Sequence, residues 1–186
     1  QYSGLAVSPV DGSIVAGGNG NDIRAFNPDG TEKWTFATPT GAINHTPAMA
    51  PDGTVYVGSQ DNNLYAIDGT TGLEKWRANL GSPLNMSSPT VGADGAVYAA
   101  TQGGFVWALD PADGTRLFFP QAAGSGGMQV ESDLLIDDAN GILFVGTGDN
   151  TANGNELTAI QLQYAGPSNL SAIGSGYDGT TPEAAP

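Results

Sequence analysis

Residues 52–76 read DGTVYVGSQDNNLYAIDGTTGLEKW, a stretch in which short apolar runs alternate with Gly, Asp and Asn. Short runs of β-branched and aromatic residues between such breaks are typical of β-strands. The runs at 55–57 and 64–67 therefore predict two strands. An Asp-Gly pair next to such a run, as at 52–53, is a strong signal for a tight turn.

The same pattern returns along the chain at a nearly constant spacing. Residues 94–118 read DGAVYAATQGGFVWALDPADGTRLF and begin 42 positions later (52 to 94). Residues 11–34 read DGSIVAGGNGNDIRAFNPDGTEKW, at an offset of 41 to 42 positions before the first stretch. A weaker fourth copy covers 140–146 and 157–161, with about five inserted residues and no closing Gly-x-x-x-Trp.

This period predicts the fold. Four short strands in about 42 residues, joined by tight turns, are the period of a β-propeller blade. We therefore expect an all-β chain of four-stranded antiparallel blades, about four in number. The predicted blades are 1–44, 45–85, 86–128 and 129–164, followed by a Gly-, Ser-, Pro- and Ala-rich tail or linker at 165–186.

A specific motif closes each of the better copies. In the second copy it is Ala66-x-Asp68-x-x-x-Gly72-x-x-x-Trp76. Its other members are Ala25 and Trp34 in the first copy, and Ala108, Asp110, Gly114 and Phe118 in the third. The motif resembles the tryptophan-docking motif of pyrroloquinoline-quinone-type propeller repeats, the quinoprotein alcohol dehydrogenase-like family. The resemblance implies a structural role for these residues, holding neighbouring blades together.

The resemblance also implies an incomplete ring. Members of this family include quinoprotein alcohol dehydrogenases with eight blades and eight-bladed relatives without catalytic activity. With about four blades, this chain is expected to be half or a fragment of an eight-bladed ring, or a small closed ring. The expected partner is another propeller half or another protein, a second copy of this chain included.

Composition excludes several classes of function. The chain has 186 residues, with 19 acidic and 5 basic side chains, for a formal net charge of −14. This balance argues against nucleic-acid binding and against docking on an anionic membrane surface. There is no cysteine and a single histidine, His45, so disulfides, thiol nucleophiles and zinc ribbons are excluded. No apolar run is long enough for a membrane span.

The residues that a quinone enzyme would need are not evident. The family's dehydrogenases commonly carry an adjacent cysteine pair, an Asp base and a Glu/Asn calcium site, and no convincing match occurs here. We therefore expect neither pyrroloquinoline quinone nor catalytic residues. A calcium ion is one interpretation of an oxygen-rich segment, and a solvated insertion is the other. That segment contains Asp149, Asn150, Asn153, Asn155 and Glu156.

Function is expected at one end of the blades. The loops between second and third strands and the connections between blades share that end, and they vary in sequence. They carry polar residues such as Asn21, Gln60, Asp61, Asn62 and Gln102. We expect simple changes at Asp61 or Asn62 to leave stability nearly unchanged.

The sequence favours a non-catalytic extracytoplasmic scaffold, secreted or periplasmic, that binds or assembles partners through this variable loop face. Part of a quinone-dependent dehydrogenase and a carbohydrate-binding or carbohydrate-active propeller are the alternatives.

Overall fold

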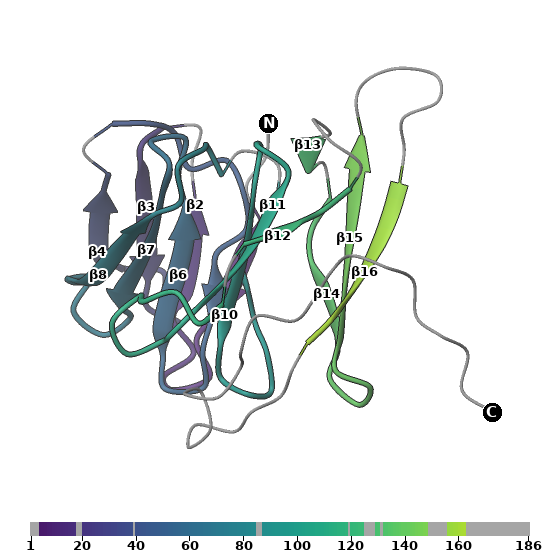
Figure 1. The fold of residues 1–186 in the computed structure, drawn as a ribbon. Helices are drawn as coiled ribbons and strands as arrows, with labels where there is room; N and C mark the ends of the chain where they lie inside the picture. Colours follow the sequence, from purple (N-terminus) through teal and green to yellow (C-terminus); the bar gives the residue numbers. More distant parts are fainter. Residues whose placement is uncertain are drawn as a thin grey trace.

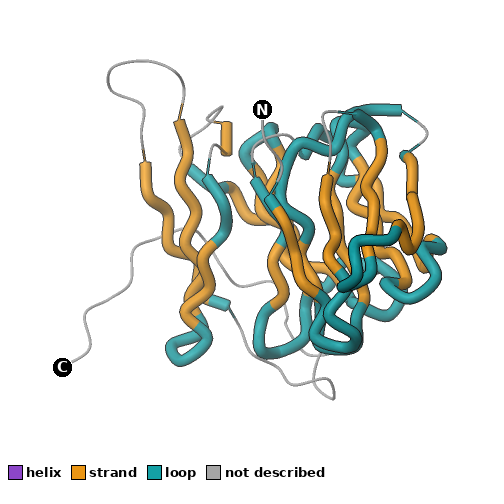
Figure 2. Tube along the Cα trace, turned by 180° about the vertical axis from the view of Figure 1, so that it is seen from behind, coloured by secondary structure: helices purple, strands orange, loops and turns teal. Residues whose placement is uncertain are grey.

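The computed structural model describes residues 4–17, 20–38, 40–84, 87–118, 120–124, 129–130, 132–148 and 156–162. This part of the chain consists of strands and loops, without a helix (Figure 2). The strands form four antiparallel sheets arranged side by side (Figure 1). The prediction of an all-β chain with four antiparallel sheets is confirmed.

The first three sheets share one simple topology, in which strand order follows chain order. Sheet 1 contains β1 (Leu5–Val7), β2 (Ile14–Gly17), β3 (Asp22–Phe26) and β4 (Glu32–Ala37). Sheet 2 contains β5 (Ala48–Met49), β6 (Thr54–Gly58), β7 (Asn63–Asp68) and β8 (Glu74–Asn79). Sheet 3 contains β9 (Thr90–Val91), β10 (Val97–Thr101), β11 (Phe105–Leu109) and β12 (Gln121–Ala122). The repeat of the sequence is thus a repeat of one four-stranded meander.

Sheet 4 departs from this plan. It contains β13 (Gln129–Val130), β14 (Leu135–Asp137), β15 (Ile142–Gly148) and β16 (Glu156–Gln161). Both β13 and β14 pair along the same side of β15, and β16 pairs along the other side. The four strands therefore occupy only three lateral positions. No strand of the described ranges pairs with the far edge of β16, in keeping with the lack of a closing Gly-x-x-x-Trp in this copy.

The core lies between sheets, because the central strands are apolar on both faces. Every residue of β6 and β10 is buried. Side chains of β6 alternate between two clusters: Val55 and Val57 pack with sheet 1, whereas Tyr56 packs with sheet 3. A third cluster, which includes Tyr98 and Leu143, fills the space between sheets 3 and 4. Each inner sheet is thus held by burial of both its faces.

The motif tryptophans bridge neighbouring sheets. The Trp34 indole lies buried on sheet 1 and its Nε1 donates to the carbonyl oxygen of Gly69 in sheet 2, at 2.9 Å. Trp76 of sheet 2 repeats this contact with the Pro111 carbonyl oxygen of sheet 3, at 2.9 Å. A Cβ added to Gly114 would lie 2.6 Å from the Trp76 ring. The ring therefore packs directly on the glycine backbone of the next sheet.

The remaining motif residues shape the turn that receives the indole. Asp68 Oδ1 accepts hydrogen bonds from the backbone N–H groups of Thr70 and Thr71, at 2.9 and 2.8 Å. Gly72 has a φ of 74°, a left-handed conformation that glycine adopts at little cost. In sheet 3, Phe118 packs against the cluster shared with sheet 4. Phenylalanine has no N–H to donate, so this third junction lacks an indole hydrogen bond.

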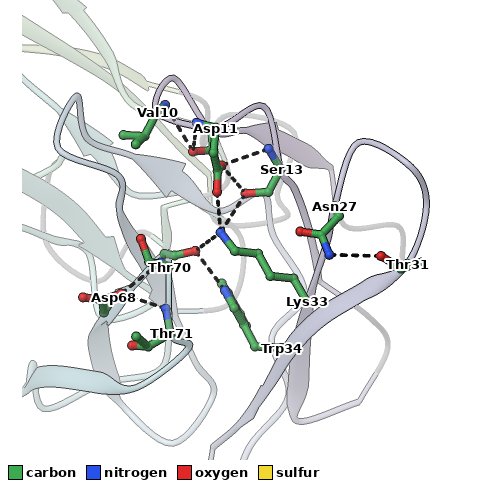
Figure 3. Close-up of polar contacts among 12 residues, drawn as sticks. Val10, Asp11, Ser13, Asn27, Thr31, Lys33, Trp34, Asp68, Thr70 and Thr71 are labelled. Carbon is green, nitrogen blue, oxygen red and sulfur yellow. Dashed lines mark hydrogen bonds and ion pairs between the residues drawn. The ribbon is translucent and has the colours of Figure 1, made fainter.

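Lys33 adds a charged link at the first junction. Its Nζ lies 2.6 Å from Asp11 Oδ2 and donates at 2.8 Å to the Gly69 carbonyl oxygen that also accepts the Trp34 indole. Figure 3 shows the Lys33 ammonium group facing both Asp11 and Ser13, with the Trp34 indole on the side away from them. The hydrogen bond from Lys33 holds the pKa of Asp11 well below its ordinary value. One carbonyl oxygen of sheet 2 is thus held by two side chains of sheet 1.

Replacement of Trp76 should test the junction between sheets 2 and 3. We expect Trp76→Ala to lower the free energy of unfolding by about 3–5 kcal/mol, because it leaves a cavity between the sheets. Urea unfolding followed by circular dichroism measures the change. Leu73→Ala is the matched control, since Leu73 is 69% exposed on the same turn-bearing end. A loss below about 1 kcal/mol for Trp76→Ala would contradict the docking role.

Candidate functional site

A groove of about 530 Å³ opens between sheets 2 and 3. It lies at the end that carries the loops from second to third strands and the connections between sheets. Its lining is predominantly apolar, with a few polar side chains at the margin. The lining residues are Asn79, Leu80, Gly81, Ser82, Thr101, Gly103, Phe105, Trp107 and Pro120. The predicted functional end of the sheets therefore carries a concave surface.

The groove forms where the outer strand of sheet 3 is cut short. The outer strands β4 and β8 have six residues each, whereas β12 has two. The register pairs Val106 with Gln121, so the next pair along the strands would join Trp107 and Pro120. Proline has no N–H to donate to a ladder and is found at strand edges and ends. The outer strand ends there, and the Trp107 side of the sheet stays accessible.

Two aromatic side chains give the groove its chemistry. Phe105 is 45% exposed at the start of β11, and Trp107 is half-buried two residues later on the same face of the strand. The guanidinium carbon of Arg116 lies 5.8 Å from the centre of the Trp107 ring, within cation–π distance. Within the described part of the chain, the Trp107 indole N–H has no hydrogen-bond partner. The surface suits an apolar side chain.

The sequence did not single out Phe105 and Trp107 as site residues. Both lie within a strand run, where aromatic side chains normally serve as core. In sheet 2, the residue equivalent to Trp107 is Tyr65, which is completely buried. Pro120 is the residue in the sequence that could have indicated this surface. A proline at a position of the outer strand predicts that the strand ends there and leaves the neighbouring strand uncovered.

Several of the polar loop residues that were predicted to contact a partner make hydrogen bonds within their own loops instead. Asp61 accepts hydrogen bonds from the backbone and side chain of Asn63, and its Oδ2 accepts one from the Tyr65 hydroxyl at 2.6 Å. Asn62 has a φ of 72°, which few residues other than glycine and asparagine tolerate. These contacts argue against the expectation that changes at Asp61 and Asn62 leave stability unchanged.

Other predicted loop residues also make local contacts. The Asn21 side chain donates to the Thr38 carbonyl oxygen at 2.8 Å, which secures the connection after β4. Gln102 donates to Gln129 at 3.2 Å and so joins sheets 3 and 4. Asn19, also on this end by sequence, lies outside the described residues.

The single histidine is part of the packing between sheets. His45 is 7% exposed, and its Nε2 lies 2.6 Å from the Leu84 carbonyl oxygen. Burial lowers the pKa of His45 to about 4, and the nearby charge of Asp133 opposes this shift only in part. Asp133 Oδ1 in turn accepts a hydrogen bond from the Ser88 backbone N–H at 2.8 Å. His45 is therefore neutral near pH 7 and has a structural environment.

The His45 environment predicts a dependence of stability on pH. The unfolded chain binds a proton at His45 below its ordinary pKa of 6.5, whereas the folded chain binds it only near pH 4. Stability should therefore fall as the pH drops from 6.5 to 4, by up to about 3 kcal/mol. Urea unfolding at intervals across this range measures the change. His45→Gln should flatten the profile in this window, and an identical slope in that variant would refute the assignment.

The calcium candidate lies mostly outside the described residues. Of its five members, only Glu156 is described, at the exposed start of β16. Among described residues, no group of three or more His, Cys, Asp or Glu side chains is placed to hold a metal ion. The calcium site stays a prediction.

The expectation that the chain holds no pyrroloquinoline quinone stays a prediction. The residues that line the groove include neither lysine nor arginine, and the Arg116 guanidinium lies against its Trp107 ring. Four of the five cations make ion pairs with carboxylates of their own sheet: Arg24, Lys33, Lys75 and Arg77.

Comparison with protein families identifies the repeat. Residues 19–166 match the family described as outer membrane protein assembly factor BamB. The chain belongs to this family. Membership confirms the resemblance to pyrroloquinoline-quinone-type repeats, and the four sheets are blades of a β-propeller. No curated protein is significantly similar to the chain.

Solved structures show the same fold. BamB from Moraxella catarrhalis superposes with a TM-score of 0.69 at 16% identity, over 87% of this chain and 46% of that chain. Quinohemoprotein alcohol dehydrogenase ADHIIG from Pseudomonas putida HK5 gives 0.66 at 20% identity, over 80% and 28%. The quinohemoprotein alcohol dehydrogenase from Comamonas testosteroni gives 0.66 at 18% identity, over 86% and 33%. The chain thus spans less than half the length of each of these structures.

No helix among the described residues has the length and apolar character that crossing a bilayer requires.

Proposed function

We propose that this BamB-family chain is a non-catalytic extracytoplasmic scaffold, secreted or periplasmic, that binds a protein partner at the groove between sheets 2 and 3. The observation that carries the proposal is the apolar groove with Phe105 and Trp107 on its surface. Concave apolar sites with an aromatic anchor and a polar margin are typical of protein-binding hot spots. The family description, outer membrane protein assembly factor, supports a role in assembly.

The partner chemistry follows from the lining. The walls offer Leu80, Phe105, Trp107 and Pro120, without a charged side chain. The chain itself carries a net charge of −14, which disfavours strongly acidic partners. A protein segment that presents aromatic or β-branched side chains, in neutral or basic surroundings, fits both features.

A titration with a labelled peptide tests the proposal. The probe is an extended peptide of about eight residues that alternates aromatic and β-branched with polar side chains, a pattern typical of strand segments. Fluorescence anisotropy should show saturable binding. Phe105→Ser should weaken it at least tenfold, because an exposed aromatic contact is lost. Leu73→Ser is the matched control, because Leu73 is 69% exposed on the opposite end of sheet 2.

Two outcomes would overturn the assignment. Equal loss of binding in Phe105→Ser and Leu73→Ser would mean that the groove is not the site. Binding of a hexasaccharide, with no binding of the peptide, would favour the carbohydrate-binding alternative, since exposed aromatic rings also stack on sugars. Thermal unfolding of both variants checks that each remains folded.

A further inference from the structure

The junction between sheets 1 and 2 shows how the repeat closes the place where sheets 2 and 3 have their groove. There, Phe36 of sheet 1 packs against Tyr65 of sheet 2, with ring centres 5.5 Å apart and ring planes at 62°. This edge-to-face arrangement is one that aromatic pairs prefer. Tyr65 is completely buried. The Phe36 ring is therefore part of what closes the junction.

Sheet 2 has no such ring to place against sheet 3. Phe36 lies two positions after Trp34 on β4, and Ala78 lies two positions after Trp76 on β8. Each of the two pairs with the residue two positions before the motif alanine of its sheet. Ala78 therefore takes the place of Phe36. It packs against the same cluster as Trp107, and its methyl group is all that reaches toward sheet 3.

Trp107 takes the place of Tyr65 on the facing side of this junction. It pairs with Ala99 as Tyr65 pairs with Val57, 42 positions earlier (65 to 107). The preceding sheet gives Tyr65 a phenyl neighbour, whereas it gives Trp107 an alanine. Trp107 is only half-buried and lines the groove. The short outer strand of sheet 3 and the missing ring of sheet 2 thus leave the same side chain accessible.

The groove is also less polar than the equivalent place in sheet 2. There, Asp61 accepts a hydrogen bond from the Tyr65 hydroxyl at 2.6 Å, and Asn63 begins β7. On sheet 3, 42 positions later, Gly103 replaces Asp61 and Phe105 replaces Asn63 (61 to 103, 63 to 105). A carboxylate and an amide are thus exchanged for a hydrogen atom and a phenyl ring. A hydrocarbon group gains more from burial in such a place than a polar group does.

The two walls of the groove are fastened to each other. The Gln102 backbone N–H donates to the Pro83 carbonyl oxygen at 2.8 Å, which joins the loop after β10 to the connection between sheets 2 and 3. A Cβ added to Gly103 would lie 3.2 Å from Ser82 Oγ, so the two loops pack closely. A groove that is formed in advance costs less conformational entropy on binding.

We propose that the groove takes a phenylalanine side chain of a protein partner, which occupies on Trp107 the place that Phe36 occupies on Tyr65. The inference rests on the proposed function and names the anchor residue of its partner. The ring contacts the Trp107 indole edge to face, and Phe105 extends the apolar contact at the margin. The net charge of −14 favours neutral or basic residues beside this phenylalanine.

A series of peptides tests the anchor on the unaltered chain. The labelled peptides share one extended sequence of polar and β-branched residues and carry phenylalanine, leucine or alanine at the central position. Fluorescence anisotropy should give the tightest binding for phenylalanine. Leucine should bind about two- to tenfold more weakly, because it lacks the aromatic contact. Alanine should bind at least about tenfold more weakly than phenylalanine, because the anchor is lost.

The variant Ala78→Phe tests the place of the ring. It gives sheet 2 the residue that sheet 1 has, so its own ring should lie on Trp107 and exclude the partner. Binding of the phenylalanine peptide should fall at least about tenfold. The midpoint of thermal unfolding should stay the same or rise, because apolar surface is covered. Ala139→Phe is the matched control, since it adds the same ring at an exposed turn of sheet 4 and should leave binding unchanged.

The outcomes separate this inference from the proposed function. Equal binding of the phenylalanine peptide and either other peptide, with all weakened by Phe105→Ser, would overturn the phenyl anchor and keep the groove as the binding site. Unchanged binding in Ala78→Phe, folded by circular dichroism, would overturn the place assigned to the ring. Binding of none of the peptides would overturn the proposed function and the anchor with it. If Ala78→Phe does not fold, the peptide series decides.

Discussion

Packing of one sheet on the next is the interaction on which the rest of this structure depends. The central strands of the inner sheets are apolar on both faces, and no sheet of this size can bury both faces by itself. Residues of β6 are shielded by sheet 1 on one side and sheet 3 on the other. Stability is therefore approximately a sum over junctions, as in other repeat proteins. The motif of each copy acts at a junction rather than within its own sheet.

The junctions differ in the polar contacts that accompany their apolar packing. The first has two donors, Lys33 and Trp34, on one carbonyl oxygen, whereas the second has only the Trp76 indole on Pro111. The third has no indole and depends on apolar packing around Phe118 together with carboxylates from sheet 4. Sheets 1 to 3 share one strand order, and the most divergent blade, sheet 4, comes last in the chain.

The irregular outer strand and the groove occur together in sheet 3. The short strand β12 ends at a proline, and the groove opens beside the residues that a longer outer strand would cover. In sheet 2, by contrast, β8 pairs along β7 and Tyr65 is completely buried. The rigid repeat thus supplies the scaffold, and a local departure from the repeat supplies the concave surface.

Local patterns in the chain were sufficient to predict the strands, the period of about 42 residues, the tight turns and the residues of the motif. These features depend on backbone preferences and on the spacing of residues close together in the chain. Each copy of the repeat contains that information within its own sequence. Within the described ranges, no outer strand pairs with β16, and the sequence indicated this difference because no Gly-x-x-x-Trp follows β16.

Features that depend on the sheet facing a residue could not be predicted from the sequence. Tyr65 and Trp107 occupy the same register, yet one is buried and the other lines a groove, because the two outer strands differ in length. His45 has a lowered pKa because the fold buries it, with its Nε2 against the carbonyl oxygen of Leu84, 39 positions along the chain. Ala66 and Ala159 share a motif position, and only the presence of a neighbouring sheet makes one buried and the other exposed. Burial is a property of the assembled array, since it is set by the surface opposite each residue and not by the residue's own neighbours in the chain.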